Sequence, residues 1–148
     1  MEIESAKPKA VLNTNVQIAA ELSKNPNSPT VELLRRWRTG QFVRLYSVTL
    51  ALELREKLEK GLSAARVEAA LSELQDLGEF VEVSGTDVVA VITADPDDDH
   101  VLACVVVGKA THIVTYDPHF DPLGGEYQGI KIVKPLEFLE ILRAREVS

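Results

Sequence analysis

Residues 95–117 read DPDDDHVLACVVVGKATHIVTYD. The acidic run at the start of this stretch suits the first turn of a helix, because carboxylates are stabilised at the positive end of a helix. The apolar residues 101–107 extend that helix, and residues 112–115 are predicted to form a strand that ends just before Asp117. A helix and a strand framed by aspartates indicate one unit of an α/β fold with carboxylates gathered at one edge of its sheet.

The rest of the chain continues this alternation of strands and helices. The patterns predict further strands at 9–12, 41–47, 80–83 and 130–133, and helices at 16–24, 30–39, 47–61, 63–78 and 135–144. The β-branched run Val88 to Ile92 is ambiguous. Alternating elements favour parallel pairing, so we expect a three-layer α/β/α sandwich with a central, mostly parallel sheet. We expect residues 1–148 to form one domain, with its core at about 9–142.

The composition of the chain limits the classes of function that fit it. The chain has 148 residues, 45% of them hydrophobic, and a net charge of −7 with a pI near 5.0. This charge argues against a protein held on nucleic acid by bulk positive charge, but it leaves room for a nuclease whose metal site is acidic. The acidic start, Met1 to Glu4, is unlike a signal peptide, and the longest apolar run, 101–107, is too short to span a bilayer. We therefore expect a cytoplasmic protein with no membrane segment.

Side chains that carry oxygen atoms lie close to the carboxyl ends of the predicted strands. Asn13 follows the first strand, Asp117 follows the strand at 112–115, and Asp98 and Asp99 open the helix before it, while Glu53 lies on a helix after the second strand. Carboxylates repel one another, so a fold that gathers several of them usually needs a cation there. Hard divalent ions such as Mg²⁺ and Mn²⁺ prefer oxygen ligands of this kind.

Five segments, in this order and spacing, resemble the PIN domain family. The matching pieces are VLNTNV at 11–16, Glu53-Leu54, DPDDDHVLA at 95–103, VTYD at 114–117 and VKPLEFL at 133–139. The chain looks most like the VapC-like toxins of bacterial toxin–antitoxin pairs. This resemblance implies a PIN-like fold, hydrolysis of RNA by an endoribonuclease that uses Mg²⁺ or Mn²⁺, a cognate antitoxin and a homodimer.

The resemblance also implies roles for particular residues. It places the catalytic positions at Asn13, Glu53, Asp99 and Asp117, and the metal ligands at Glu53, Asp98, Asp99 and Asp117. The family has aspartate where this chain has Asn13, and an asparagine contributes one neutral oxygen and no charge, so weaker metal binding and weak or absent catalysis are expected. Residues expected to orient water or substrate are Thr14, Asn15 and Thr115, and a basic rim that includes Arg35 and Arg38 is the expected contact for phosphates.

Other interpretations stay open at this point. Asn13 favours a catalytically inactive PIN-fold module that binds RNA or protein. A phospho-accepting receiver domain is also α/β, but it needs an acidic pair after the first strand, where this chain has Asn13-Thr14-Asn15. Arginines 35, 36, 38 and 44 are also compatible with a solvated helix face. Of the three histidines, His119 lies nearest to the predicted site, although a structural role is favoured for each.

Overall fold

The computed structural model describes residues 6–146, so the N-terminal tetrapeptide considered above lies outside the described residues. Six strands form one sheet in the order β3-β2-β1-β4-β6-β5. All neighbouring strands are parallel except β5 and β6, which are antiparallel. The predicted α/β class with a mostly parallel sheet is confirmed. The strands are β1 Lys9–Leu12, β2 Val43–Tyr46, β3 Glu79–Phe80, β4 His112–Val114, β5 Glu126–Tyr127 and β6 Ile130–Val133.

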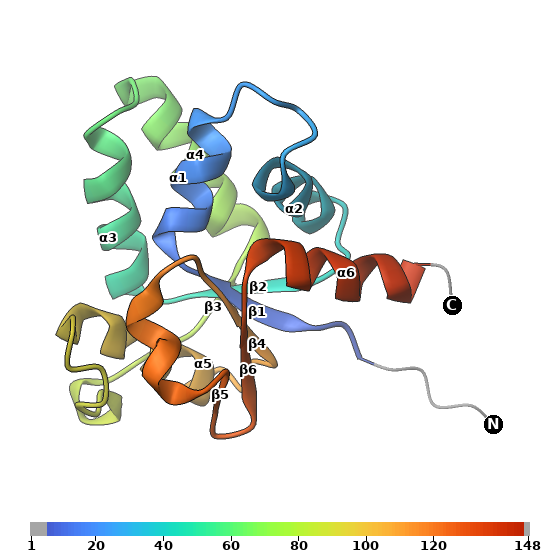
Figure 1. The fold of residues 1–148 in the computed structure, drawn as a ribbon. Coiled ribbons are helices and arrows are strands. Elements are labelled where there is room, and N and C mark those ends of the chain that lie inside the picture. The colour runs from blue at the N-terminus through green and yellow to red at the C-terminus, as the bar shows by residue number, and fades with distance from the viewer. Residues whose placement is uncertain (1–5, 147–148) are drawn as a thin grey trace.

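Helices cover both faces of the sheet unequally (Figure 1). Most of the helical layer, namely α1, α2, α3, α4 and α6, lies on one side of the strands, and α5 lies on the other. Their bounds are α1 Thr14–Leu22, α2 Pro29–Arg38, α3 Val48–Glu59, α4 Ala64–Leu77, α5 Asp99–Val107 and α6 Pro135–Glu146, with 3₁₀ turns at Gly85–Asp87, Pro96–Asp98 and Pro118–Leu123.

The alternation of side chains along β1 produces two hydrophobic cores. Ala10 and Leu12 point into the core shared with α1, α2, α3, α4 and α6, whereas Val11 points into the core that contains α5. All three residues are buried. Since both faces are covered, the central strand is apolar on both sides, which is typical of parallel sheets.

The structure differs from the expected elements at the two edge strands of the sheet and at residues 88–92. The strand predicted at 80–83 is reduced to Glu79–Phe80, although the Val81 amide still donates to the Tyr46 carbonyl at 2.8 Å. The ambiguous run Val88 to Ile92 forms no regular element. β3 is an edge strand with both residues exposed, so little packing holds a longer strand there. The short β5 was not predicted from the sequence.

Glu32 joins α2 to α6. Its carboxylate accepts hydrogen bonds from Arg36 on α2 at 2.8 Å and from Arg143 on α6 at 2.6 Å. The Arg143 bond, helped by the Arg36 bond and opposed by burial, lowers the pKa of Glu32 to about 2. A lowered carboxyl pKa means that this contribution to stability is present above the ordinary pKa near 4.5 and is lost as the pH falls toward 2.

Replacing Glu32 by glutamine should therefore lower the free energy of unfolding by about 1 kcal/mol at pH 7, a value that allows for screening by solvent. The difference from the wild type should shrink as the pH falls from 5 toward 3. Urea denaturation at several pH values measures it, with Glu140→Gln, an exposed acid on α6, as the matched control. A loss that is the same at every pH would contradict this account.

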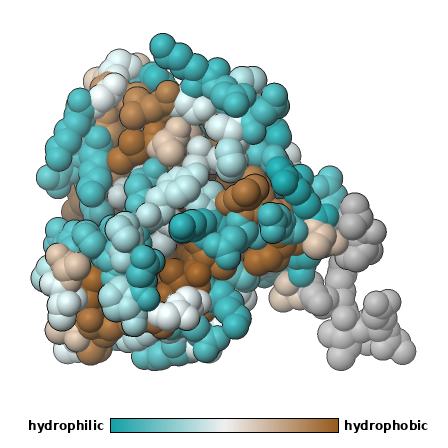
Figure 2. All heavy atoms as spheres, viewed as in Figure 1, coloured by the Kyte–Doolittle hydropathy of each residue, from teal (hydrophilic) through white to brown (hydrophobic). Residues whose placement is uncertain are grey.

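No helix within residues 6–146 is both long and apolar enough to cross a membrane. Hydrophobic side chains do reach the surface at particular places. Figure 2 shows such side chains over α1, next to α3, and in further patches on the same face. A groove between α1 and the end of α3 there is lined by Ile18, Leu22, Leu58 and Leu62, and Leu22 is 58% exposed.

Candidate metal centre at the carboxyl edge of the sheet

The site begins where β1 and β4 end side by side. The Asn13 amide N–H donates to the carbonyl of Val114, the last residue of β4, at 2.9 Å. This parallel pairing brings the residues after β1 next to the residues after β4. Side chains that are about a hundred residues apart in the sequence therefore meet at one edge, as expected for an α/β sheet.

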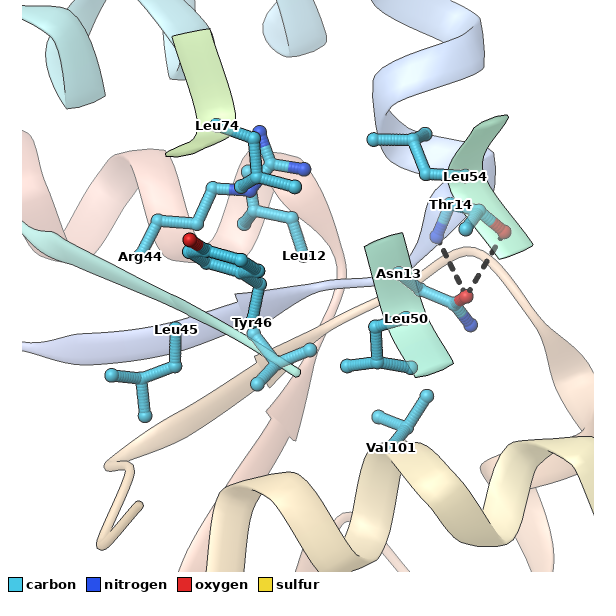
Figure 3. A pocket seen from close by; sticks show the side chains of 11 residues that line it. Leu12, Asn13, Thr14, Arg44, Leu45, Tyr46, Leu50, Leu54, Leu74 and Val101 are labelled. Carbon is cyan, nitrogen blue, oxygen red and sulfur yellow. Dashed lines mark hydrogen bonds between the residues drawn. The ribbon is translucent and has the colours of Figure 1, made fainter. Parts of the chain in front are cut away.

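Both ends of the Asn13 side chain are engaged by neighbours. Asn13 caps α1: its Oδ1 accepts from the Thr14 amide N–H at 2.7 Å, and lies 3.5 Å from the Thr14 hydroxyl (Figure 3). Its Nδ2 donates to the Thr115 Oγ1 at 2.9 Å. All three side chains are buried. The asparagine is thus a well-placed cap that carries no charge.

Glu53 reaches the same place from α3. The Thr14 hydroxyl donates to the Glu53 Oε1 at 3.4 Å, which links Glu53 to Asn13 through one residue. Lys57, one turn along α3, lies 3.9 Å from the same oxygen. Burial raises the pKa of Glu53, and the nearby Lys57 ammonium opposes that change. A half-buried carboxylate whose charge is disfavoured by burial gains from a metal ion that supplies a compensating positive charge.

Asp117, His119 and Asp98 form the other half of the site. Thr115 Oγ1 accepts from the Asp117 amide at 2.9 Å, and Asp117 Oδ1 accepts from the His119 amide at 2.9 Å. The His119 Nδ1 lies 3.1 Å from both Asp117 Oδ1 and Asp98 Oδ2. Burial raises the pKa of Asp98 to about 6 against the His119 hydrogen bond, and the nearby Asp117 and Asp95 carboxylates raise it further. The Asp98 hydrogen bond raises the pKa of His119.

Asp99 occupies a different position from the other acids. Its Oδ1 accepts from the Val91 and Ile92 amides at 3.0 and 2.8 Å, and its side chain is buried. This carboxylate therefore fastens the irregular segment before α5 to the start of that helix. The family resemblance implied that Asp98 and Asp99 are both metal ligands and that Asp99 is the catalytic one, but it is Asp98 whose carboxylate lies against His119.

The arginines expected to form a basic rim lie on the side of the sheet opposite the carboxyl ends of the strands. α6 starts after β6 and runs back, and its last residue, Glu146, pairs with Arg36 of α2 at 2.6 Å. Arg38 donates both of its bonds to Glu73 on α4, at 2.8 and 3.0 Å. Arg35 is exposed on the same helix. The phosphate-contacting role expected for Arg35 and Arg38 does not fit this placement.

Two residues with weak sequence signals belong to the site. Ligating atoms of Asp95, Asp98 and His119 all lie within 4.8 Å of one another. Asp95 also caps the Pro96–Asp98 turn, because its Oδ1 accepts from the Asp97 amide at 3.0 Å. The only sequence signal for His119 was its position two residues after Asp117. Asn15 stays at the rim, where its Oδ1 accepts from the Tyr116 amide at 3.3 Å.

The cavities around the site differ in size. The one below Asn13 (Figure 3) holds only about 10 Å³ between mainly apolar side chains, which is room for at most one water. A cleft of about 290 Å³ opens beside Asp117, between the segments that follow β4 and β6. Of these two spaces, only the cleft beside Asp117 has room for more than a water molecule. Asp98 belongs to the group whose ligating atoms converge, and Glu53 and Asp117 add carboxylates to the same series of contacts. Carboxylate oxygens are the hard donors that a divalent cation prefers.

Comparisons with known proteins agree with this geometry. Curated proteins yield no match to the sequence. Solved structures with the same fold include VapBC2 from Rickettsia felis, bound to a DNA fragment from their promoter (TM-score 0.58, 13% identity, covering 85% of this chain and 97% of that one). FitAcB from Neisseria gonorrhoeae matches with a TM-score of 0.55 and 18% identity over 86% and 98% of the two chains.

A third structure is that of Mycobacterium tuberculosis VapC20, a toxin that cleaves the sarcin–ricin loop, with a TM-score of 0.58 and 13% identity over 82% and 98%. At these identities the likeness concerns the fold alone. The sequence pattern of the PIN domain family matches residues 9–119, a span that holds Glu53, Asp98, Asp99 and Asp117. The chain therefore belongs to the PIN domain family.

Proposed function

We propose that this chain is a metal-dependent endoribonuclease of the PIN type, the toxin of a type II toxin–antitoxin pair, with an activity weakened by Asn13. One observation carries the proposal. A continuous series of polar contacts runs across four segments of the chain and joins its acidic side chains at one edge of the sheet. It passes through Glu53, Thr14, Asn13, Thr115, Asp117, His119 and Asp98.

Three carboxylates of this series, those of Glu53, Asp98 and Asp117, would hold Mg²⁺ or Mn²⁺. When bound, such an ion polarises the phosphate, eases deprotonation of a water and offsets charge on the leaving oxygen. The protein's own part is to orient the ligands. Thr115 holds the backbone of Asp117, and Thr14 holds Glu53. The cleft beside Asp117 offers space for RNA on that side.

The substrate class and the partner come from the family and its solved structures. Cleavage of the sarcin–ricin loop by VapC20 supports RNA as the substrate. The VapC-like resemblance supports a cognate antitoxin, a homodimer and a cytoplasmic location. An antitoxin that placed a basic side chain among Glu53, Asp98 and Asp117 would pair with them and block the site.

Replacing Asp117 by asparagine tests the proposed centre. The change keeps the shape of the side chain but removes a ligand charge, so Mn²⁺ affinity and RNA cleavage should each fall by about tenfold or more, since even residues that only support ligands cost 10- to 100-fold. Calorimetric titration with MnCl₂ and cleavage of a fluorescent RNA measure the two effects. Asp121→Asn, an exposed aspartate in the same 3₁₀ turn, is the control. Unchanged Mn²⁺ affinity in Asp117→Asn would overturn the proposal.

A second candidate is a non-catalytic PIN module that binds RNA or protein. The observation in its favour is that Asn13 carries no charge and that its Oδ1 already accepts from the Thr14 amide while its Nδ2 is bonded to Thr115, so it offers a cation only one neutral lone pair. The two candidates differ in one measurement. If RNA binds but neither the wild type nor Asn13→Asp cleaves it with Mn²⁺, the module interpretation holds.

A further inference from the structure

We propose that His119 supplies a nitrogen ligand to the divalent ion, so that the centre prefers a first-row transition-metal ion to Mg²⁺. This inference rests on the proposed metal-dependent function and adds a ligand that the acidic motif does not contain. It concerns the binding of the ion itself. Its test therefore does not depend on RNA cleavage.

The geometry places the imidazole between two carboxylates. The Nδ1 of His119 lies 3.1 Å from Asp98 Oδ2 and 3.1 Å from Asp117 Oδ1, so both oxygens face the same ring nitrogen. Asp95, Asp98 and His119 each offer a ligating atom that lies within 4.8 Å of the other two. A cation that accepts Asp98 and Asp117 as ligands therefore arrives at the place toward which Nδ1 points.

The backbone holds the ring there. His119 is the second residue of the 3₁₀ turn Pro118–Leu123, and its amide is bonded to Asp117 Oδ1 at 2.9 Å. The next residue, Phe120, is 1% exposed and anchors the turn in the core that contains α5. The His119 side chain itself is 38% exposed. It is thus fixed at its base and can adjust its ring, as a ligand must.

The donor set explains the expected preference. Mg²⁺ binds oxygen and keeps several waters, whereas first-row transition ions accept imidazole nitrogen more readily. Asn13 removes one anionic oxygen from the family's set, so an additional neutral donor matters more in this chain. Mn²⁺ is the weakest binder of the transition series, which makes it a stringent probe of the preference.

The contacts of His119 with the two carboxylates are compatible with two roles, which predict opposite changes in metal affinity. If His119 served only as a cationic partner for Asp98 and Asp117, it would compete with a metal ion, and removing it would strengthen ion binding. If it is a ligand, removing it weakens the binding of Mn²⁺ more than that of Mg²⁺. The sign of the change in affinity therefore distinguishes a ligand from a competitor.

The experiment uses the full chain, stripped of metal with a chelator and then titrated calorimetrically with MnCl₂ and with MgCl₂ near pH 7.5. The variant His119→Ala is compared with His100→Ala, a histidine outside the cluster. We expect His119→Ala to lose about tenfold or more in Mn²⁺ affinity, with a smaller loss for Mg²⁺, and His100→Ala to behave as the wild type. Circular dichroism of each variant checks that it is folded.

Electron spin echo spectroscopy of the Mn²⁺-loaded protein gives a direct second readout. Modulation from a coordinated ¹⁴N nucleus should be present in the wild type and in His100→Ala, and absent from His119→Ala. Bound Mn²⁺ without nitrogen modulation, or stronger Mn²⁺ binding by His119→Ala, would overturn the inference and leave the proposed nuclease centre standing. A wild type that binds no Mn²⁺ at all would overturn both.

Discussion

Changing Asn13 to aspartate is expected to strengthen Mn²⁺ binding by about ten- to a hundredfold and to give or raise Mn²⁺-dependent cleavage of RNA. The new carboxylate would stand at the end of β1, within the series that joins Glu53 to Asp117. A unit charge about 4 Å from a cation is worth on the order of 4 kcal/mol per cation charge near a protein surface. Desolvation and repulsion among the carboxylates reduce that gain, hence the smaller expected factor.

The hydrogen bonds around position 13 can accommodate the change. An aspartate would still accept from the Thr14 amide, which now bonds Asn13 Oδ1 at 2.7 Å. The Thr115 hydroxyl accepts from Asn13 Nδ2 and from the Asp117 amide, and its own hydrogen remains to be donated to a carboxylate. The substitution therefore changes the charge more than the packing.

The same substitution should destabilise the protein when no metal is present. A further negative charge beside the existing carboxylates costs about 1 kcal/mol of unfolding free energy, and bound Mn²⁺ should more than reverse that loss. Thermal unfolding with EDTA measures the loss of stability without metal, and thermal unfolding with MnCl₂ measures the gain when Mn²⁺ is bound. Asn15→Asp, the same change two residues along the chain, is the control. Equal Mn²⁺ affinities in wild type and Asn13→Asp would refute the role given to position 13.

Truncating Asp99 to alanine should lower the free energy of unfolding by about 2–4 kcal/mol, because two backbone N–H groups lose their acceptor. These are the amides of Val91 and Ile92, and Ile92 is 5% exposed. Asp99→Asn keeps a carbonyl oxygen in the same place and should lose much less. Urea denaturation of the metal-free protein provides the measurement.

Asp98→Asn is the matched comparison, and it should act in the opposite sense. Folding raises the pKa of Asp98 from its ordinary 3.8 to about 6, chiefly through burial. Stability from this group is therefore present below about pH 4 and lost as the pH rises through 6, so removing the charge should stabilise the metal-free fold at pH 7.5, by about 1 kcal/mol. Mn²⁺ affinity should fall in Asp98→Asn. The reverse pattern, with Asp99 controlling Mn²⁺ and Asp98 controlling stability, would refute this division of roles.

Local sequence patterns predicted most of the fold for a clear physical reason. The runs at 9–12, 112–115 and 130–133 are short and apolar, and all three form parallel neighbours in the sheet. The failures lie where tertiary contacts decide. Residues 88–92 have strand-like composition, but the Asp99 carboxylate takes two of their amides, and they form no ladder. The strand expected at 80–83 lies at the sheet edge and is only two residues long.

The candidate site divides in the same way. Asn13, Glu53 and Asp117 were identified from residue type and position after a strand or on a helix, because parallel strands bring their carboxyl ends to one edge. Sequence patterns could not predict which of Asp98 and Asp99 faces His119, because neighbouring residues at the start of a helix differ only in the direction of their side chains. Arg35 and Arg38 looked like a phosphate rim in the sequence, but α2 carries them to the far edge.

The sequence by itself determined that acidic side chains follow the strands of a parallel α/β sheet, a fact that depends on residue identity and on short-range periodicity. Its resemblance to the PIN domain family added that the charge expected at position 13 is missing. Only the tertiary structure decided that Asp98 faces Asp117, that Asp99 supports the backbone and that His119 lies between two carboxylates. Such outcomes depend on side-chain directions and on contacts between segments up to 21 residues apart, which no local pattern encodes.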